Sequence, residues 1–120
     1  MIQIFGTKKC AETRKAERFF RERGAKVHFI DLAQKGPSPG ELRSIAQAVG
    51  GVFKLFDKEG KRAADKGLRQ ALLGDPDIER LIVADPLLLR TPVVRFGKAA
   101  TVGAETPESK ALWAEWAKQK

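Results

Sequence analysis

Met1–Phe20, the first twenty residues, read MIQIFGTKKCAETRKAERFF and decide the fold. The apolar run Ile2–Phe5 predicts a short strand, and GTKK predicts a loop after it. A helix is expected over about Ala11–Arg23, ending at Gly24. Three apolar residues fall on one face of that helix: Ala16, Phe19 and Phe20. Cys10, the one cysteine of the chain, therefore lies where the loop becomes the helix.

A second strand is expected at Lys26–Asp31, where Val27 and Phe29 share one face. The following loop leads into a helix whose start carries clear signals. Ser38 is a suitable N-cap, the next residue is a proline, and Glu41 completes a capping box. This helix buries a stripe and ends at two glycines: Leu42, Ile45, Ala46 and Val49, then Gly50 and Gly51.

The middle of the chain is less regular. Asp57–Gly60 predicts a turn, and Ala64–Leu72 predicts a helix. A further short helix is expected with Asp75 as N-cap before Pro76, and Asp85-Pro86 should break it.

The last third of the chain predicts a hairpin and a final helix. Val93–Phe96 forms one strand, Gly97 and Lys98 turn the chain, and AATVG returns beside it. Thr106 caps a helix that is expected to bury Leu112, Trp113 and Trp116. The element order predicts an α/β protein with a thioredoxin-like fold, a mixed four-stranded sheet and a helical insert. Residues 1–120 are expected to form a single domain.

Composition narrows the class of protein. The net charge is +8, from 23 Lys and Arg against 15 Asp and Glu, but the charges are mixed and contain no long basic run. With no Tyr and mostly apolar Phe positions, direct nucleic-acid binding is not expected. One cysteine excludes an internal disulfide, one histidine supports no metal site, and no membrane span is evident. These features predict a cytoplasmic protein.

The position of Cys10 favours a reactive thiol. A helix N-terminus carries unpaired N–H groups and a partial positive charge, which stabilise a thiolate. Lys8, Lys9 and Arg14 add cations around it. The alternative is a small buried apolar residue without chemistry. Thr13 stands where a Cys-x-x-Cys pair would have its second thiol, so any disulfide chemistry needs a thiol from outside the chain.

Two further sites stand out near a predicted strand. Pro92, directly before the strand, is a candidate cis-proline beside the thiol loop, with an ordinary strand-start proline as the alternative. Arg90 offers a bidentate contact to an anion, or is a surface arginine. His28, alone on a strand, is expected to be a surface residue rather than a base.

Several stretches together resemble the arsenate reductase (ArsC) and Spx family, in its arsenate-reductase-like branch. They are CAETRKAERFFRERG, SPGELRSIAQAVG and DPLLLRTPVVRFGKAATVG. The most specific pieces are the Cys-x-x-Thr-Arg start and the DPLLLRTPVV block. The family has a thioredoxin-like fold with a helical insert, which agrees with the order of elements read above.

The resemblance implies roles for particular residues. Cys10 falls on the nucleophilic cysteine of the family, and Pro92 falls on its cis-proline. Arg90 falls on the first position of an Arg-Arg-Pro or Asn-Arg-Pro block, and Thr91 stands where the arginine before the proline would be. Substrate or anion binding is accordingly expected at five residues: Thr13, Arg14, Arg90, Thr91 and Pro92. Two further anion-binding arginines of the family are replaced here by Asp57 and Gly103.

The sequence therefore supports two functions. The first is a thiol-dependent oxidoreductase that uses Cys10 as nucleophile and an external thiol, such as glutathione, as co-substrate, with glutaredoxin as a further possible partner. The second is a non-enzymatic regulator, like Spx, that binds RNA polymerase or another protein. A member of the family that has kept the fold and lost its chemistry is the third interpretation. No cofactor and no metal is expected.

Overall fold

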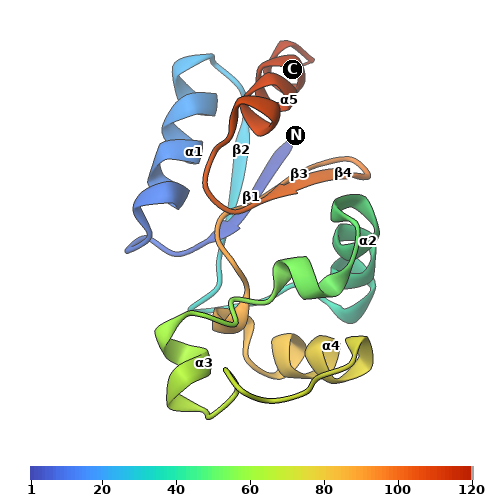
Figure 1. Ribbon diagram of the computed structural model, residues 1–120. Helices are drawn as coiled ribbons and strands as arrows, with labels where there is room; N and C mark the ends of the chain where they lie inside the picture. The colour runs from blue at the N-terminus through green and yellow to red at the C-terminus, as the bar shows by residue number, and fades with distance from the viewer. Residues whose placement is uncertain (120) are drawn as a thin grey trace.

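A computed structural model describes residues 1–119 and shows a four-stranded sheet between two layers of helices (Figure 1). The elements in chain order are β1 (Ile2–Gly6), α1 (Ala11–Glu22), β2 (Val27–Asp31), α2 (Pro39–Val49), η1 (Val52–Leu55), α3 (Lys61–Asp65), α4 (Asp75–Ala84), η2 (Pro86–Leu88), β3 (Val93–Phe96), β4 (Ala99–Val102) and α5 (Pro107–Lys118). The predicted α/β class and the helical insert between the two halves of the sheet are both confirmed.

The sheet is mixed and has the strand order β2-β1-β3-β4. β1 pairs with β2 in parallel, so that Ile4 lies opposite Phe29, and with β3 antiparallel, so that Ile4 also lies opposite Val94. β3 and β4 form the predicted hairpin. Because β3 runs antiparallel to β1, the chain entering β3 comes beside the chain leaving β1. The thiol loop, residues 7–9 between β1 and Cys10, lies at this end of the two strands.

The two faces of the sheet bury different side chains. Ile2 and Ile4 face α1 and α5, where an aromatic cluster forms around Trp113. Phe5 and Val93 face the other way, against an aliphatic cluster. Residues from α2, η1, α4 and η2 build that second cluster: Leu42, Ile45, Leu55, Ile78, Ile82 and Leu88. Successive side chains along each strand point to opposite faces of the sheet, and helices cover both faces.

The helix ends follow the local signals in the sequence. Gly24 has a φ of 73° after α1, and Ala25 N–H donates to the Phe20 carbonyl, which is the bond of a Schellman motif. Ser38 Oγ accepts from Glu41 N–H, and the Glu41 carboxylate accepts from Ser38 N–H, so the capping box of α2 is confirmed. α1 and α5 have 12 residues each, and within residues 1–119 no helix could cross a membrane.

Three sequence predictions were wrong in detail. The helix expected over Ala64–Leu72 is instead α3, which is earlier and has five residues. Gly67 stops it, with a φ of 72°, and Leu68 N–H donates to the Ala63 carbonyl. Asp75 is the first residue of α4 rather than its cap. The cap is Gly74, whose N–H donates to the Asp77 carboxylate.

The third correction concerns α5. Leu112 is 46% exposed rather than buried. The stripe that faces the sheet consists of Trp113, Trp116 and Ala117, and Leu112 lies about 100° around the helix from Trp113. Trp113 and Trp116 are buried as predicted.

Candidate active site

Cys10 is placed by the end of β1 and the start of α1. After Gly6, a loop of three residues leads to Cys10, which is the N-cap residue of α1. Its N–H donates to the Thr7 carbonyl at 3.2 Å, and its carbonyl accepts from Arg14 N–H at 3.1 Å. The backbone is therefore fixed on both sides of the thiol. The side chain, partly exposed, lies at the helix end where backbone N–H groups lack helical partners.

Thr91 brings a hydroxyl to the sulfur from the other half of the chain. Its Oγ1 donates to Cys10 Sγ at 3.2 Å, across 81 residues of sequence. Thr91 stands just before β3, and the start of β3 lies beside the end of β1, where Val93 is opposite Phe5. The pairing of β1 with β3 therefore places Thr91 beside the thiol loop.

Thr13 lies in the first turn of α1, three residues after Cys10. Its side chain is fully buried, and its hydroxyl makes no hydrogen bond to another group of residues 1–119. A buried hydroxyl without a partner is costly. Gly6 makes room for it, because a Cβ at that position would collide with the Thr13 hydroxyl. The sequence pattern around Cys10 gives no indication of this role of Gly6.

The surroundings of Cys10 favour its charged form. Partial burial acts to raise the pKa of the thiol, but the hydroxyls of Thr13 and Thr91 and the amides of Thr13 and Glu12 together lower it below its ordinary value. Neither amide nor the Thr13 hydroxyl makes a well-formed hydrogen bond to the neutral thiol. We therefore interpret these three groups as donors that strengthen once the sulfur carries a charge.

Pro92 follows a cis peptide bond, as the sequence predicted. It is buried, and its carbonyl accepts from Gly103 N–H at 2.9 Å. This bond joins the turn before β3 to the end of β4. Thr91 and Pro92 thus form one fixed wall beside the thiol.

The two predicted anion-binding arginines use their guanidinium groups elsewhere. Arg14 Nη1 donates to the Lys8 carbonyl at 2.7 Å and so clamps the thiol loop. Arg90 Nη1 donates to the Lys54 carbonyl at 3.3 Å. Among residues 1–119 neither guanidinium donates to Cys10 Sγ. Their role in anion binding stays a prediction.

Gly103 explains where the Arg90 side chain goes. A Cβ at Gly103 would lie 2.9 Å from Arg90 Nη2, so the missing side chain leaves the space that the guanidinium occupies. The φ of Gly103 is 88°, which also favours glycine. Asp57 lies at the loop after η1 and donates its N–H to the Leu88 carbonyl. Neither Asp57 nor Gly103 carries a cation, so neither could supply the arginine that the resemblance to the family places there.

The other residues singled out in the sequence lie outside this cluster. His28 is exposed on the edge strand β2, as expected. Within residues 1–119, no group of three His, Cys, Asp or Glu side chains is arranged to hold a metal ion. Lys8 and Lys9 are exposed on the loop just before Cys10.

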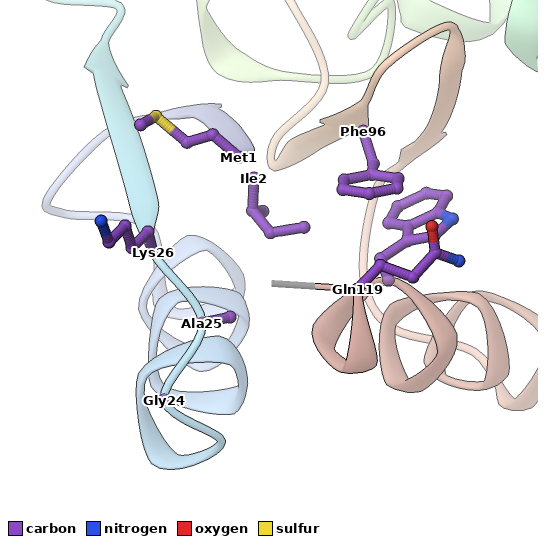
Figure 2. A pocket seen from close by; sticks show the side chains of 8 residues that line it. Met1, Ile2, Gly24, Ala25, Lys26, Phe96 and Gln119 are labelled. Atoms are coloured by element: carbon purple, nitrogen blue, oxygen red, sulfur yellow. The ribbon is translucent and has the colours of Figure 1, made fainter.

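A separate hollow lies at the opposite end of β1 (Figure 2). It has a volume of about 520 Å³ and is mainly apolar. Its lining includes Ile2, Ala25, Phe96 and Trp116. In Figure 2 the ammonium group of Lys26 points away from Phe96. The hollow lies where β1 begins, and Cys10 follows the point where β1 ends, so it is not part of the thiol site.

Comparisons with known proteins show the family and the fold of the chain. The model of the ArsC family matches residues 5–112. The chain is 27% identical over 109 residues to Uncharacterized protein YusI of Bacillus subtilis (strain 168), covering 88% of this chain and 92% of that protein. It is 24% identical over 109 residues to Global transcriptional regulator Spx 2 of Bacillus anthracis, covering 90% and 83%. The solved structure of an arsenate reductase from Vibrio cholerae superposes with a TM-score of 0.76 at 20% identity, covering 92% and 94%.

Proposed function

Because the chain belongs to the ArsC family, we propose that it is an arsenate-reductase-like, thiol-dependent oxidoreductase whose nucleophile is Cys10. One observation carries the proposal: Thr91 Oγ1 donates to Cys10 Sγ at 3.2 Å at the start of α1. A hydroxyl and a helix end that meet at one sulfur stabilise a thiolate, and the thiolate is the reactive form of cysteine.

The reaction would proceed in two steps. Cys10 Sγ, as thiolate, attacks the oxidised substrate and forms a covalent bond to it while the leaving group departs. An external thiol such as glutathione, or the thiol of a glutaredoxin, then attacks the intermediate and restores the thiolate. The second thiol must be external because Cys10 is the only cysteine of the chain. A reaction that consumes reduced thiols suits the cytoplasm.

Mass spectrometry after exposure to oxidised glutathione tests this function. We expect one glutathionyl adduct on Cys10. Excess reduced glutathione, added afterwards, should remove this adduct. Cys10→Ser serves as the blank and should stay unmodified. A wild-type chain that forms no adduct, or an adduct that glutathione cannot remove, would contradict the proposal.

A second candidate function rests on the relative named Global transcriptional regulator Spx 2 and on the net charge of +8. On this hypothesis the chain binds RNA polymerase or another protein without catalysis. Pull-down with wild type and Cys10→Ser discriminates the two functions. Equal capture of RNA polymerase by both proteins, with no turnover by the wild type, would favour the regulator.

A further inference from the structure

We propose that Thr91 sets the substrate class of this site, which is the uncharged sulfur of a disulfide rather than a tetrahedral oxyanion. The inference rests on the proposed function and narrows it. Its first support is the kind of group around Cys10 Sγ. The observed hydrogen bond to the sulfur comes from the Thr91 hydroxyl, the Thr13 hydroxyl and the amides at the start of α1 also favour the thiolate, and none of these groups carries a charge.

The buried Thr13 hydroxyl indicates that the site stabilises a negative charge on the sulfur of Cys10. It is fully buried and lacks a hydrogen-bond partner among residues 1–119, and it acts to lower the pKa of the Cys10 thiol. A thiolate is a stronger acceptor than a thiol, and it gives this hydroxyl the bond that it otherwise lacks. The site is thus built to hold one negative charge on sulfur.

A tetrahedral oxyanion would bring further negative charge. Removing such an ion from water is costly unless several cationic donors bind it. Here the Arg14 guanidinium is bound to the Lys8 carbonyl, and the Arg90 guanidinium to the Lys54 carbonyl. The first turn of α1 also carries the Glu12 carboxylate, which pairs with Lys15 at 3.3 Å and would repel an anion bound beside it. Among residues 1–119 no Lys or Arg group contacts Cys10 Sγ, so a dianion bound at the sulfur would meet no cation that is already directed at it.

A disulfide suits the same surroundings. The Cys10 thiolate attacks one sulfur of the substrate disulfide, a new S–S bond forms, and the old S–S bond breaks to release the other sulfur as a thiolate. An external thiol then cleaves the Cys10 mixed disulfide by the same exchange, which leaves a new disulfide and restores Cys10. The Thr91 hydroxyl can donate to the thiolate and turn away from the neutral disulfide, whereas an arginine would keep its charge throughout.

The test compares two substrates with reduced glutathione as reductant: a peptide–glutathione mixed disulfide and arsenate. The proteins are wild type, Thr91→Val, which keeps the shape and loses the hydroxyl, and Thr91→Ser, which keeps the hydroxyl. We expect wild type to consume the mixed disulfide and to oxidise no more glutathione with arsenate than Cys10→Ser does. Thr91→Val should lose about five- to tenfold in kcat/KM, with its pH profile displaced to higher pH, and Thr91→Ser should stay within about twofold of wild type.

The outcomes separate the inference from the function on which it rests. Faster consumption of arsenate than of the mixed disulfide would overturn the inference and leave the thiol-dependent function standing. A Thr91→Val protein with wild-type rate and pH profile would also overturn it. If wild type consumes neither substrate, both the inference and the proposed function fail. Circular dichroism of the variants checks that each is folded.

Discussion

The two ends of β1 differ in a way that shows where chemistry lies in this molecule. One end opens into an apolar hollow of about 520 Å³, lined by Ile2, Phe96 and Trp116. The other end has Cys10, with the hydroxyl of Thr91 at 3.2 Å from its sulfur. Lys26 also lines the apolar hollow, but in Figure 2 its ammonium group points away from Phe96. Convergence of polar donors, rather than size of cavity, therefore identifies the candidate site.

The largest expected effect is on the free energy of unfolding, and it tests whether the aromatic cluster around Trp113 contributes to stability alone. Trp113 is 1% exposed, packs against Phe19 and Phe20, and donates its indole N–H to Thr101 Oγ1 at 2.8 Å. Trp113→Ala should lower the free energy of unfolding by about 3–5 kcal/mol in urea denaturation. The alkylation rate of Cys10 in the folded protein should stay unchanged. A slower rate would show that the two ends of β1 are coupled.

Thr13→Val tests whether the buried Thr13 hydroxyl contributes to the reactivity of Cys10. Valine keeps the volume of the buried side chain but removes its hydroxyl, so the thiolate loses one donor. Alkylation of Cys10 by iodoacetamide at neutral pH should slow by about five- to tenfold. At acid pH, where the thiol is neutral and the hydroxyl has no partner, the free energy of unfolding should not fall. Unchanged alkylation would remove Thr13 from the site.

Asp85→Asn tests the ion pairs that join α3 to the end of α4 within the helical insert. Asp85 Oδ2 accepts from Arg62 Nε at 2.7 Å and lies 3.3 Å from Lys66 Nζ. Burial acts to raise the pKa of Asp85, but the bonds to Arg62 and Lys66 lower it more. A lowered pKa in the folded state means that the pair stabilises the fold above the unfolded pKa of about 3.9 and loses this effect as pH falls through the folded pKa.

Urea denaturation from pH 7 down to pH 3 checks this prediction. Wild type should be more stable than Asp85→Asn at neutral pH, and the difference should shrink below about pH 4. A difference that stays constant or grows on acidification would contradict the assignment.

The smallest expected effect is at the apolar end. Phe96 stacks on Trp116 with ring centroids 5.9 Å apart, so Phe96→Leu should cost about 1 kcal/mol of unfolding free energy. The thiol pKa and the alkylation rate of Cys10 should equal those of wild type. A shift in either would break the separation between the two ends of β1.

Much of the fold was predictable because its signals are local. The strand, loop, Cys10 and helix at the start, the capping box of Ser38, and the cis bond before Pro92 were all read correctly from short stretches. The extent of α3 was not, because Gly67 lies inside a run that otherwise favours a helix. The exposure of Leu112 depends on how α5 rotates against the sheet, which a local pattern does not fix.

The residues of the candidate site could be predicted from the sequence, but their burial and their contacts with one another could not. The sequence singled out Thr13 and Arg90 together with Cys10. It did not show that Thr13 is fully buried behind Gly6, or that the Arg90 guanidinium turns to the Lys54 carbonyl beside Gly103. These contacts join segments far apart in the chain, so they depend on the sheet and the insert rather than on local spacing.

The pKa of Cys10 tests the central claim most directly. It is obtained by following thiolate absorbance against pH, with Cys10→Ser as the blank and with alkylation rate as a second readout. The account predicts a pKa below the unperturbed value of about 8.5 for a free cysteine, and a rate that rises over the same pH range. A value at or above 8.5 with slow alkylation would contradict the account and leave protein binding as the function to pursue.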